Sequence, residues 1–279
     1  MAREVNLRFS LVVPCFNHLD VSRQFLRTLL AHGPLGEQVE LVLVNDASTD
    51  GTADWMNSLR SAFVTVVQHT ENSGFARAMN AGAQAATGEF LVLLNNDLLL
   101  TPHWFEPFRA CAQSWTVDLG IAGNVQLRTS DSMVDHAGVE FTALGRLQHV
   151  QHLDPSQLVR TSPLLTGACF MLPKRDFLEY GGFDTAYVNG AEDMALCLQA
   201  LQRGRRNVVL NRSVIFHHVS VSRANADQDA RNLANLVHLY EHWTHGLADI
   251  YASQYPEHNA LNVIQAELMR LKALKLNTN

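Results

Sequence analysis

The sequence predicts an α/β fold with a mostly parallel central sheet, and three observations lead to this prediction. Short apolar runs alternate with stretches of helical spacing, an order typical of β-α-β units with right-handed crossovers. The apolar run inside GEFLVLLNNDLLLTP, residues 88–102, is continuous enough to indicate a strand buried on both faces. Three of the first four predicted strands end in polar clusters, which places these clusters in one crevice at the carboxyl edge of the sheet.

Composition narrows the class of protein. A chain of 279 residues can form one large or two small domains with a sizeable core, and 47% hydrophobic with 17% charged residues indicates a soluble globular protein. The net charge of -6 argues against a protein that binds nucleic acid through a broad basic face. Four cysteines without a CxxC pair suggest neither a zinc site nor a disulfide framework, so reduced thiols are expected.

The amino terminus, MAREVNLRFS, carries charges of both signs and lacks the apolar core of a signal peptide. No uninterrupted apolar stretch reaches the roughly 18 residues of a membrane span. We therefore expect a cytoplasmic protein, with peripheral contact at the inner face of the membrane left open.

The first half of the chain alternates strands and helices. The predicted strands are residues 9–13, 39–44, 63–67 and 90–99. The helix after the first strand is predicted to place four apolar residues on one side, Phe25, Leu26, Leu29 and Leu30. The predicted helix 73–86 is rich in Ala and begins next to Gly74, which allows a close approach at its start. Such a helix start is a natural seat for phosphate, although glycine-containing starts are also common without a ligand.

The polar clusters supply candidate ligands. In NDASTDGT, Asp50 or Thr52 could simply cap the next helix, whereas Asp46 lies closer to the strand end and is the better candidate for ligand contact. In NND, residues 95–97, Asp97 has no basic neighbour in sequence, and its burial is costly unless it meets a cation or hydrogen-bond donors. A divalent metal explains this cluster, but Asn-Asn-Asp is equally good turn chemistry.

The second half is less regular. We predict helix 103–115, strand 119–127, hairpin pieces near Val139 and Leu147 within a polar stretch 128–163, an apolar segment 164–172, a short helix in KRDFLEYGGFD, a helix in NGAEDMALCLQALQRG, strand 208–216, and two tail helices at 226–245 and 257–275.

Three features of the second half of the chain have ordinary structural explanations. Glu192 and Asp193 suit a first helical turn through the helix dipole, and the pair His217 and His218 after a strand is more often structural than functional. The apolar spacing of the last helix favours packing against the domain or a second subunit, which would give a homodimer, over an anionic membrane surface.

Six ordered blocks resemble family 2 glycosyltransferases of the GT-A fold. They are VVPCFN, VNDASTDGT, NSGFARAMNAGAQAATGEFLVLLNND, LTGACFMLPKRDFLEYGGFD, AEDMALCL and the HH pair. The chain is most similar to the rhamnosyltransferase-like branch of that family. The resemblance implies a Rossmann-like nucleotide-binding GT-A domain over residues 1–222, followed by a C-terminal helical extension, 223–279, that acts as a lid, in packing or in dimerisation.

The resemblance also implies roles for the clusters. NND takes the part of the Asp-x-Asp motif, so Asp97 is expected to bind a divalent cofactor, Mn²⁺ or Mg²⁺, against the donor diphosphate. His217 is expected to complete the metal site, with His218 as the alternative. Asn95 and Asn96 are expected to line the nucleotide or sugar.

The resemblance further implies that Asp193 occupies the position of the catalytic base and that Glu192 lies beside it in the substrate site. Gly167 and Ala168 resemble the small residues that leave room for the sugar. The nucleoside and phosphate walls are expected to include Pro14, Phe16, Asn17, Asn45, Asp46, Asn72, Gly74, Arg77 and Asn80. Two departures stand out: Asn45 replaces an acid that usually reads the base or ribose, and Ala195 replaces the last acid of EDxD.

The expected function is a metal-dependent inverting transfer from a UDP- or dTDP-sugar to a glycan, lipid-linked or protein acceptor, in cell-surface polysaccharide or glycoconjugate synthesis. A nucleotidyltransferase would show a Gly-rich basic loop after the first strand, which CFNHLD is not. A non-catalytic nucleotide-sugar binder or scaffold is disfavoured because Asp97, Asp193 and His217 are all present. Acceptor choice and a closing lid are expected from residues 128–163 and from SVSRANADQDARN.

Overall fold

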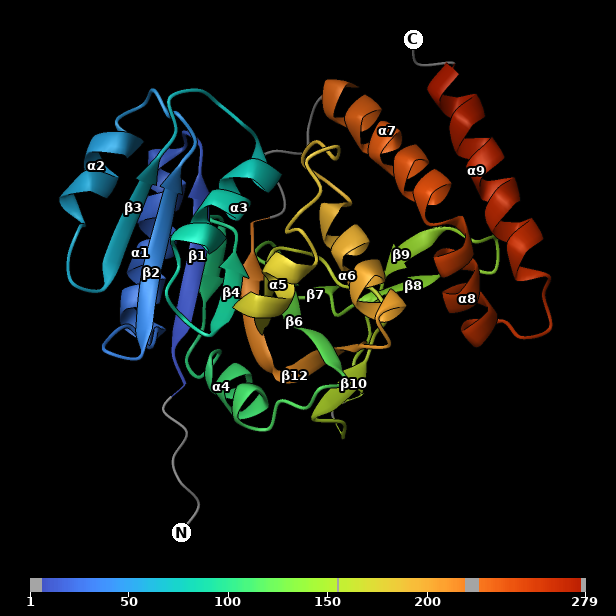
Figure 1. Ribbon diagram of the computed structural model, residues 1–279, viewed down its shortest axis with the longest axis horizontal. Helices are drawn as coiled ribbons and strands as arrows, with labels where there is room; N and C mark the ends of the chain where they lie inside the picture. Colours follow the sequence, from blue (N-terminus) through green and yellow to red (C-terminus); the bar gives the residue numbers. More distant parts are fainter. Residues whose placement is uncertain (1–6, 155, 219–225, 277–279) are drawn as a thin grey trace.

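The computed structural model describes residues 7–154, 156–218 and 226–276, which form a central sheet covered by helices on both faces (Figure 1). The strands are β1 Phe9–Cys15, β2 Val39–Asn45, β3 Val64–Gln68, β4 Phe90–Leu94, β5 Leu98–Leu100, β6 Leu119–Arg128, β7 Val134–His136, β8 Val139–Phe141, β9 Leu147–His149, β10 Val159–Thr161, β11 Cys169–Pro173 and β12 Arg206–His217. The helices are α1 Leu19–His32, α2 Thr52–Ser58, α3 Phe75–Ala85, α4 Glu106–Gln113, α5 Lys174–Glu179, α6 Glu192–Gln202, α7 Ala226–His242, α8 Thr244–Gln254 and α9 Ala260–Leu276.

The main sheet has the order β10-β12-β6-β11-β4-β1-β2-β3, with β5 joined to β12 and β7 joined to β6. The strands β4, β1, β2 and β3 are mutually parallel, and β6 is parallel to β12. Strand β11 runs antiparallel between β4 and β6. The α/β prediction with a mostly parallel sheet is therefore confirmed.

Alternate side chains of the inner strands enter two different cores. Val12 faces the core that α3, α5, α6 and the tail helices cover, whereas Leu11 and Val13 face the core that α1, α2 and α4 cover. All five residues of β4 are buried, as its unbroken apolar run predicted.

Two predicted elements differ from those observed. The single strand 90–99 is two strands, because the chain turns at residues 95–97 and β5 pairs with β12 instead of continuing β4. The tail contains α8 in addition to the two predicted helices. Only Trp243 separates α7 from α8, so no turn signal in the sequence marks the break.

The tail helices share the core of the main domain rather than standing apart. Hydroxyl groups of Tyr240, Tyr251 and Tyr255 donate to the backbone carbonyls of Gly145, Ala143 and Phe141 in the β8–β9 hairpin. Helix α9 packs on α7 and α8 and buries Ile264 and Leu271, so its apolar face packs within the chain. The predicted boundary at 222 lies outside the described residues, as do residues 220–225 of SVSRANADQDARN, whereas residues 226–232 of that segment belong to α7. None of the described helices combines the length and apolarity needed to cross a bilayer.

Candidate active site

The turn between β4 and β5 lies against the end of β12. Leu98 pairs with His217 in the antiparallel β5–β12 register, and the His218 N–H donates to the Asp97 carbonyl at 3.1 Å. This pairing brings the Asp97 carboxylate to 3.4 Å from Nε2 of His217. The two predicted metal ligands, 120 residues apart in sequence, are thus neighbours in the fold.

Asp97 has an unusual environment for a carboxylate. Its Oδ1 is buried and accepts no hydrogen bond from any described residue, and the same holds for Asn95 Oδ1. Nε2 of His218 is likewise buried without a hydrogen-bond partner among the described residues. Such groups are costly unless something else meets them, and a carboxylate oxygen beside an imidazole nitrogen, as in Asp97 and His217, suits a divalent cation. Within the described ranges, no three His, Cys, Asp or Glu side chains cluster to hold a metal alone.

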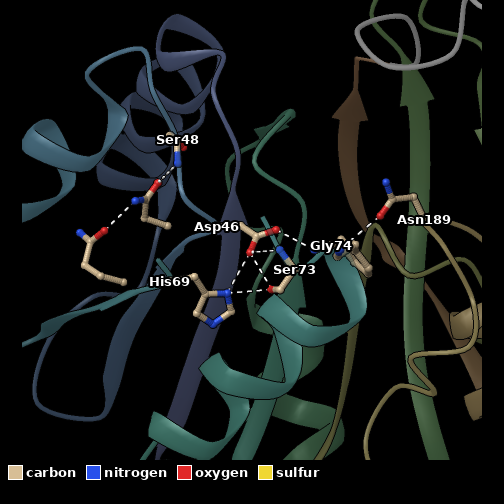
Figure 2. Close-up of polar contacts among 9 residues, drawn as sticks. Asp46, Ser48, His69, Ser73, Gly74 and Asn189 are labelled. Carbon is tan, nitrogen blue, oxygen red and sulfur yellow. Dashed lines mark hydrogen bonds and ion pairs between the residues drawn. The ribbon is translucent and has the colours of Figure 1, made fainter. Parts of the chain in front are cut away.

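Asp46, at the end of β2, has the opposite environment. Its Oδ1 accepts from Ser73 N at 2.9 Å, Ser73 Oγ at 2.7 Å and His69 Nδ1 at 2.8 Å, and its Oδ2 accepts from Gly74 N at 2.8 Å (Figure 2). Burial alone would raise the pKa of Asp46, but these hydrogen bonds outweigh it and hold the pKa below its ordinary value.

The same contacts occupy the start of α3, where the sequence suggested a phosphate seat. Asp46 accepts the N–H groups of Ser73 and Gly74, and Asn189 Oδ1 accepts that of Phe75 at 3.2 Å. Protein groups therefore already satisfy these three amides. His69, which contacts Asp46, and Asn189, which contacts Phe75, were not predicted as site residues from the sequence.

The ends of β1 and β2 are joined by amide side chains. Asn45 donates from Nδ2 to Gln68 Oε1 at 2.6 Å and accepts from Ser48 N at 3.1 Å. Asn17 accepts from Thr49 N at 2.8 Å. Next to them, Phe16 keeps 45% of its surface exposed, and Pro14 is half-buried within β1. The predicted nucleoside wall is thus preorganised, with one exposed aromatic ring.

Asn72, Arg77 and Asn80 lie along α3 and the turn before it. The Asn80 amide holds both backbone groups of Phe183, at 2.9 and 2.8 Å. Arg77 and Asn80 line a cavity of about 510 Å³ together with Gln68, His69, Thr70, Glu71, Ser73, Ala81, Gln84 and Thr185. Asn72 is exposed. Neither Asp97 nor Asp193 lines this cavity, so the structure does not bring these residues together there.

Asp193 lies at the start of α6 against the segment Gly167–Ala168. Its Oδ2 accepts from Gly167 N at 2.6 Å and its Oδ1 from Met194 N at 2.7 Å. A Cβ on Gly167 would lie 3.0 Å from the Asp193 Cβ, a tight contact, so the close approach favours glycine. Ala168 O accepts from Asn95 N at 2.9 Å. This segment therefore connects the predicted base to the NND turn, and four of the predicted site residues converge.

The two carboxyl groups at the start of α6 are both shifted toward the neutral form. Burial, followed by the charge of Asp193, raises the pKa of Glu192 to about 7. Burial also raises the pKa of Asp193. Glu192 Oε2 accepts from Gly190 N at 2.6 Å, so its carboxyl is held beside the base rather than in solvent.

The polar stretch 128–163 contributes two histidines that the sequence did not single out. Nε2 of His136 accepts from Thr166 N at 3.1 Å, next to Gly167, and the ring packs at 5.0 Å from that of His149. Burial, with the nearby His149 and His217, lowers the pKa of His136 well below its ordinary value, so the ring is neutral. His136 thus supports the segment on which Asp193 rests.

Residues 10–175, more than half of the chain, match the family model for glycosyl transferase family 2. The chain belongs to glycosyltransferase family 2. This confirms the family that the sequence blocks predicted, whereas the rhamnosyltransferase-like branch stays a prediction.

Curated relatives of this family 2 glycosyltransferase include an uncharacterised protein, y4gI, of Sinorhizobium fredii, 27% identical over 86% of this chain and 28% of the relative. Another is the O-antigen biosynthesis protein RfbC of Myxococcus xanthus, 25% identical over 77% of this chain and 18% of the relative. The chain spans less than a third of either relative. It also superimposes on GalNAc-T7, solved with UDP, GalNAc and Mn²⁺, with a TM-score of 0.71 and 18% identity over 92% of this chain and 52% of that one. The fold is therefore GT-A.

Proposed function

We propose that this protein is a metal-dependent inverting glycosyltransferase that moves a sugar from a UDP- or dTDP-sugar to a hydroxyl of a glycan, lipid-linked or protein acceptor. One observation carries the proposal. The Asp97 carboxylate has a buried oxygen that no described donor meets, it lies beside His217, and the backbone of residues 167–168 connects its turn to Asp193. The kinship with RfbC supports a place in cell-surface polysaccharide or glycoconjugate synthesis.

Asp97 and His217 would hold the divalent cation, Mn²⁺ or Mg²⁺. Two protein ligands leave further positions for phosphate oxygens and water, which is how such ions are commonly bound beside nucleotides. When bound, the cation stabilises the negative charge that develops on the departing diphosphate. The Mn²⁺ and UDP in the GalNAc-T7 structure support this assignment.

Asp193 acts as the base in the transfer. The acceptor oxygen forms a bond to the anomeric carbon as the bond from that carbon to the diphosphate oxygen breaks, and the acceptor proton passes to the Asp193 carboxylate. The N–H groups of Gly167 and Met194 fix the orientation of this carboxylate. Its raised pKa makes the carboxylate a stronger proton acceptor.

The test is turnover of UDP-, dTDP-, GDP- and CMP-sugars with Mn²⁺, with Mg²⁺ and with chelator. We expect one donor to be turned over only with metal, and Asp193→Asn to lower kcat by about 10²- to 10⁴-fold. Asp54→Asn is the matched control, because Asp54 is also a first-turn acid, of α2, but is exposed. Absence of donor binding with and without metal would favour the scaffold, and equal kcat for wild type and Asp193→Asn would remove Asp193 as the base.

A further inference from the structure

The loop 187–191, which we name the base loop, leads directly into Glu192 and Asp193 and is held by a helix from the tail. The buried side chain of Asn235 on α7 accepts from Val188 N at 3.1 Å and donates to Val188 O at 2.9 Å. One amide side chain thus satisfies both backbone groups of a residue 47 positions away.

Further contacts follow the same face of α7. The ring of His238 packs at 4.9 Å from that of Tyr187, and Asn232 Oδ1 would lie 3.4 Å from a Cβ on Gly190. Asn232, Asn235 and His238 are spaced by three, so they form one stripe on the helix. Asn235 and His238 thus contact the base loop at Val188 and Tyr187, and Asn232 lies close to Gly190.

The base loop is held from the other side by α3. Asn189 Oδ1 accepts the N–H of Phe75, the first residue of α3, and Figure 2 shows this contact beside the Asp46 cluster. Asn189 has φ 53°, a left-handed conformation that asparagine tolerates better than most residues. The base loop therefore connects the start of α3 with α7 of the tail.

The last residues of the loop transmit this restraint to the base. Ala191, immediately before α6, has φ 69°, a left-handed conformation that a non-glycine residue keeps only where its surroundings hold it. The Gly190 N–H donates to Glu192 Oε2. With Val188 and Asn189 fixed by side chains, the direction in which α6 starts is fixed too, and Asp193 is its second residue.

We propose that Asn235 and Asn189 are positioning residues that hold the base loop and thereby place Asp193, which makes α7 a working part of the active site. The inference rests on the proposed function only for the role of Asp193. A base that moves by about 1 Å loses a large part of its rate advantage without any change in donor contacts.

The first experiment compares Asn235→Ala with Glu241→Gln, an exposed residue of the same helix that lies outside residues 220–232 and away from the base loop. Three quantities are measured: amide hydrogen exchange of residues 186–194, kcat, and donor Kd. For Asn235→Ala we expect faster exchange in this segment and a kcat lower by about tenfold or more, with donor Kd within about twofold. Glu241→Gln should match wild type in all three.

A second set of variants separates the effect of the hydrogen bond between Asn189 and Phe75 from the effect of the backbone conformation at residue 189. Asn189→Gly keeps the left-handed conformation accessible but removes the acceptor for Phe75 N–H, whereas Asn189→Asp keeps an acceptor. We expect kcat to fall in the glycine variant and to recover in the aspartate variant. Asn189 lies in a surface loop, so these variants report on its hydrogen bond to Phe75 even if Asn235→Ala fails to fold.

The inference and the proposed function fail differently. Unchanged exchange in 186–194, or faster exchange with unchanged kcat, overturns the positioning role while transfer itself remains. Equal kcat in Asn189→Gly and Asn189→Asp also overturns it. A wild-type protein that turns over no donor overturns the proposed function, and with it the placing of a base, whatever the exchange shows.

Discussion

Asp46 and Asp97 occupy corresponding places in the sheet but very different surroundings. Each follows the carboxyl end of a parallel strand, β2 or β4, and these two strands flank β1. Asp46 receives four hydrogen bonds from three residues, whereas Asp97 Oδ1 receives none from the described chain. A carboxylate at such an edge is structural when protein donors saturate it, and is available for a ligand when they do not.

The difference arises from which chain segment folds back onto each strand end. The start of α3 turns toward β2 and presents backbone N–H groups and the Ser73 hydroxyl to Asp46. The β5–β12 pairing instead brings the ring of His217 to Asp97, a group that can share a metal with it.

The largest effect is expected from Asp97→Ala. Loss of this ligand should lower metal-dependent transfer by about 10³-fold, because stabilisation of the departing diphosphate is lost. The free energy of unfolding should change by less than about 1 kcal/mol, since among the described residues the Asp97 side chain accepts no hydrogen bond on its buried oxygen and loses only a 3.4 Å ion-pair contact with His217. Initial rates across a Mn²⁺ titration and chemical denaturation measure the two quantities.

His217→Ala tests the same site from β12 and should raise the Mn²⁺ concentration needed for half-maximal rate. The contrast between Asp46 and Asp97 would be wrong if Asp97→Ala lowered the free energy of unfolding as much as Asp46→Ala does while sugar transfer persisted.

Asp46→Ala is expected to act on stability instead. It leaves the two backbone N–H groups of residues 73 and 74 and the His69 ring without their acceptor, which should lower the free energy of unfolding by about 3 kcal/mol. Because the pKa of Asp46 lies below its ordinary value in the folded protein, this stabilisation is present at neutral pH and is lost as the pH falls through the acidic range.

Urea denaturation at pH 7 and at pH 3 measures the Asp46 effect, with Asp20→Asn as control, since the Asp20 side chain is 97% exposed. A loss of equal size at both pH values would mean that packing, rather than the charge of Asp46, accounts for it.

Sequence reasoning found both aspartates but could not tell which of them protein donors would saturate. Apolar runs predicted the inner strands because burial on both faces leaves a local signature, and the polar strand ends followed from the same runs. The donors that saturate Asp46 come from 23 to 28 residues downstream, and the partner of Phe75 comes from 114 residues away. Such contacts depend on tertiary folding, which no local pattern records. His136, in the irregular stretch 128–163, was missed for the same reason.

Glu192 lies between the two extremes, because its carboxyl accepts from the Gly190 N–H and is otherwise held by burial, and it gives the smallest expected effect. Its folded-state pKa of about 7 is above the ordinary 4.5, so the folded protein binds the proton more tightly than the unfolded chain. Its contribution to stability is therefore full below pH 4.5 and lost as the pH rises to about 7. Glu192→Gln keeps an acceptor for Gly190 N–H and removes the charge, so it should stabilise the protein at pH 8 and leave its stability unchanged at pH 4. Denaturation at the two pH values measures this, and its pH dependence is opposite in sign to that of Asp46. A gain of the same size at both would show that Glu192 is not held in its neutral form by burial.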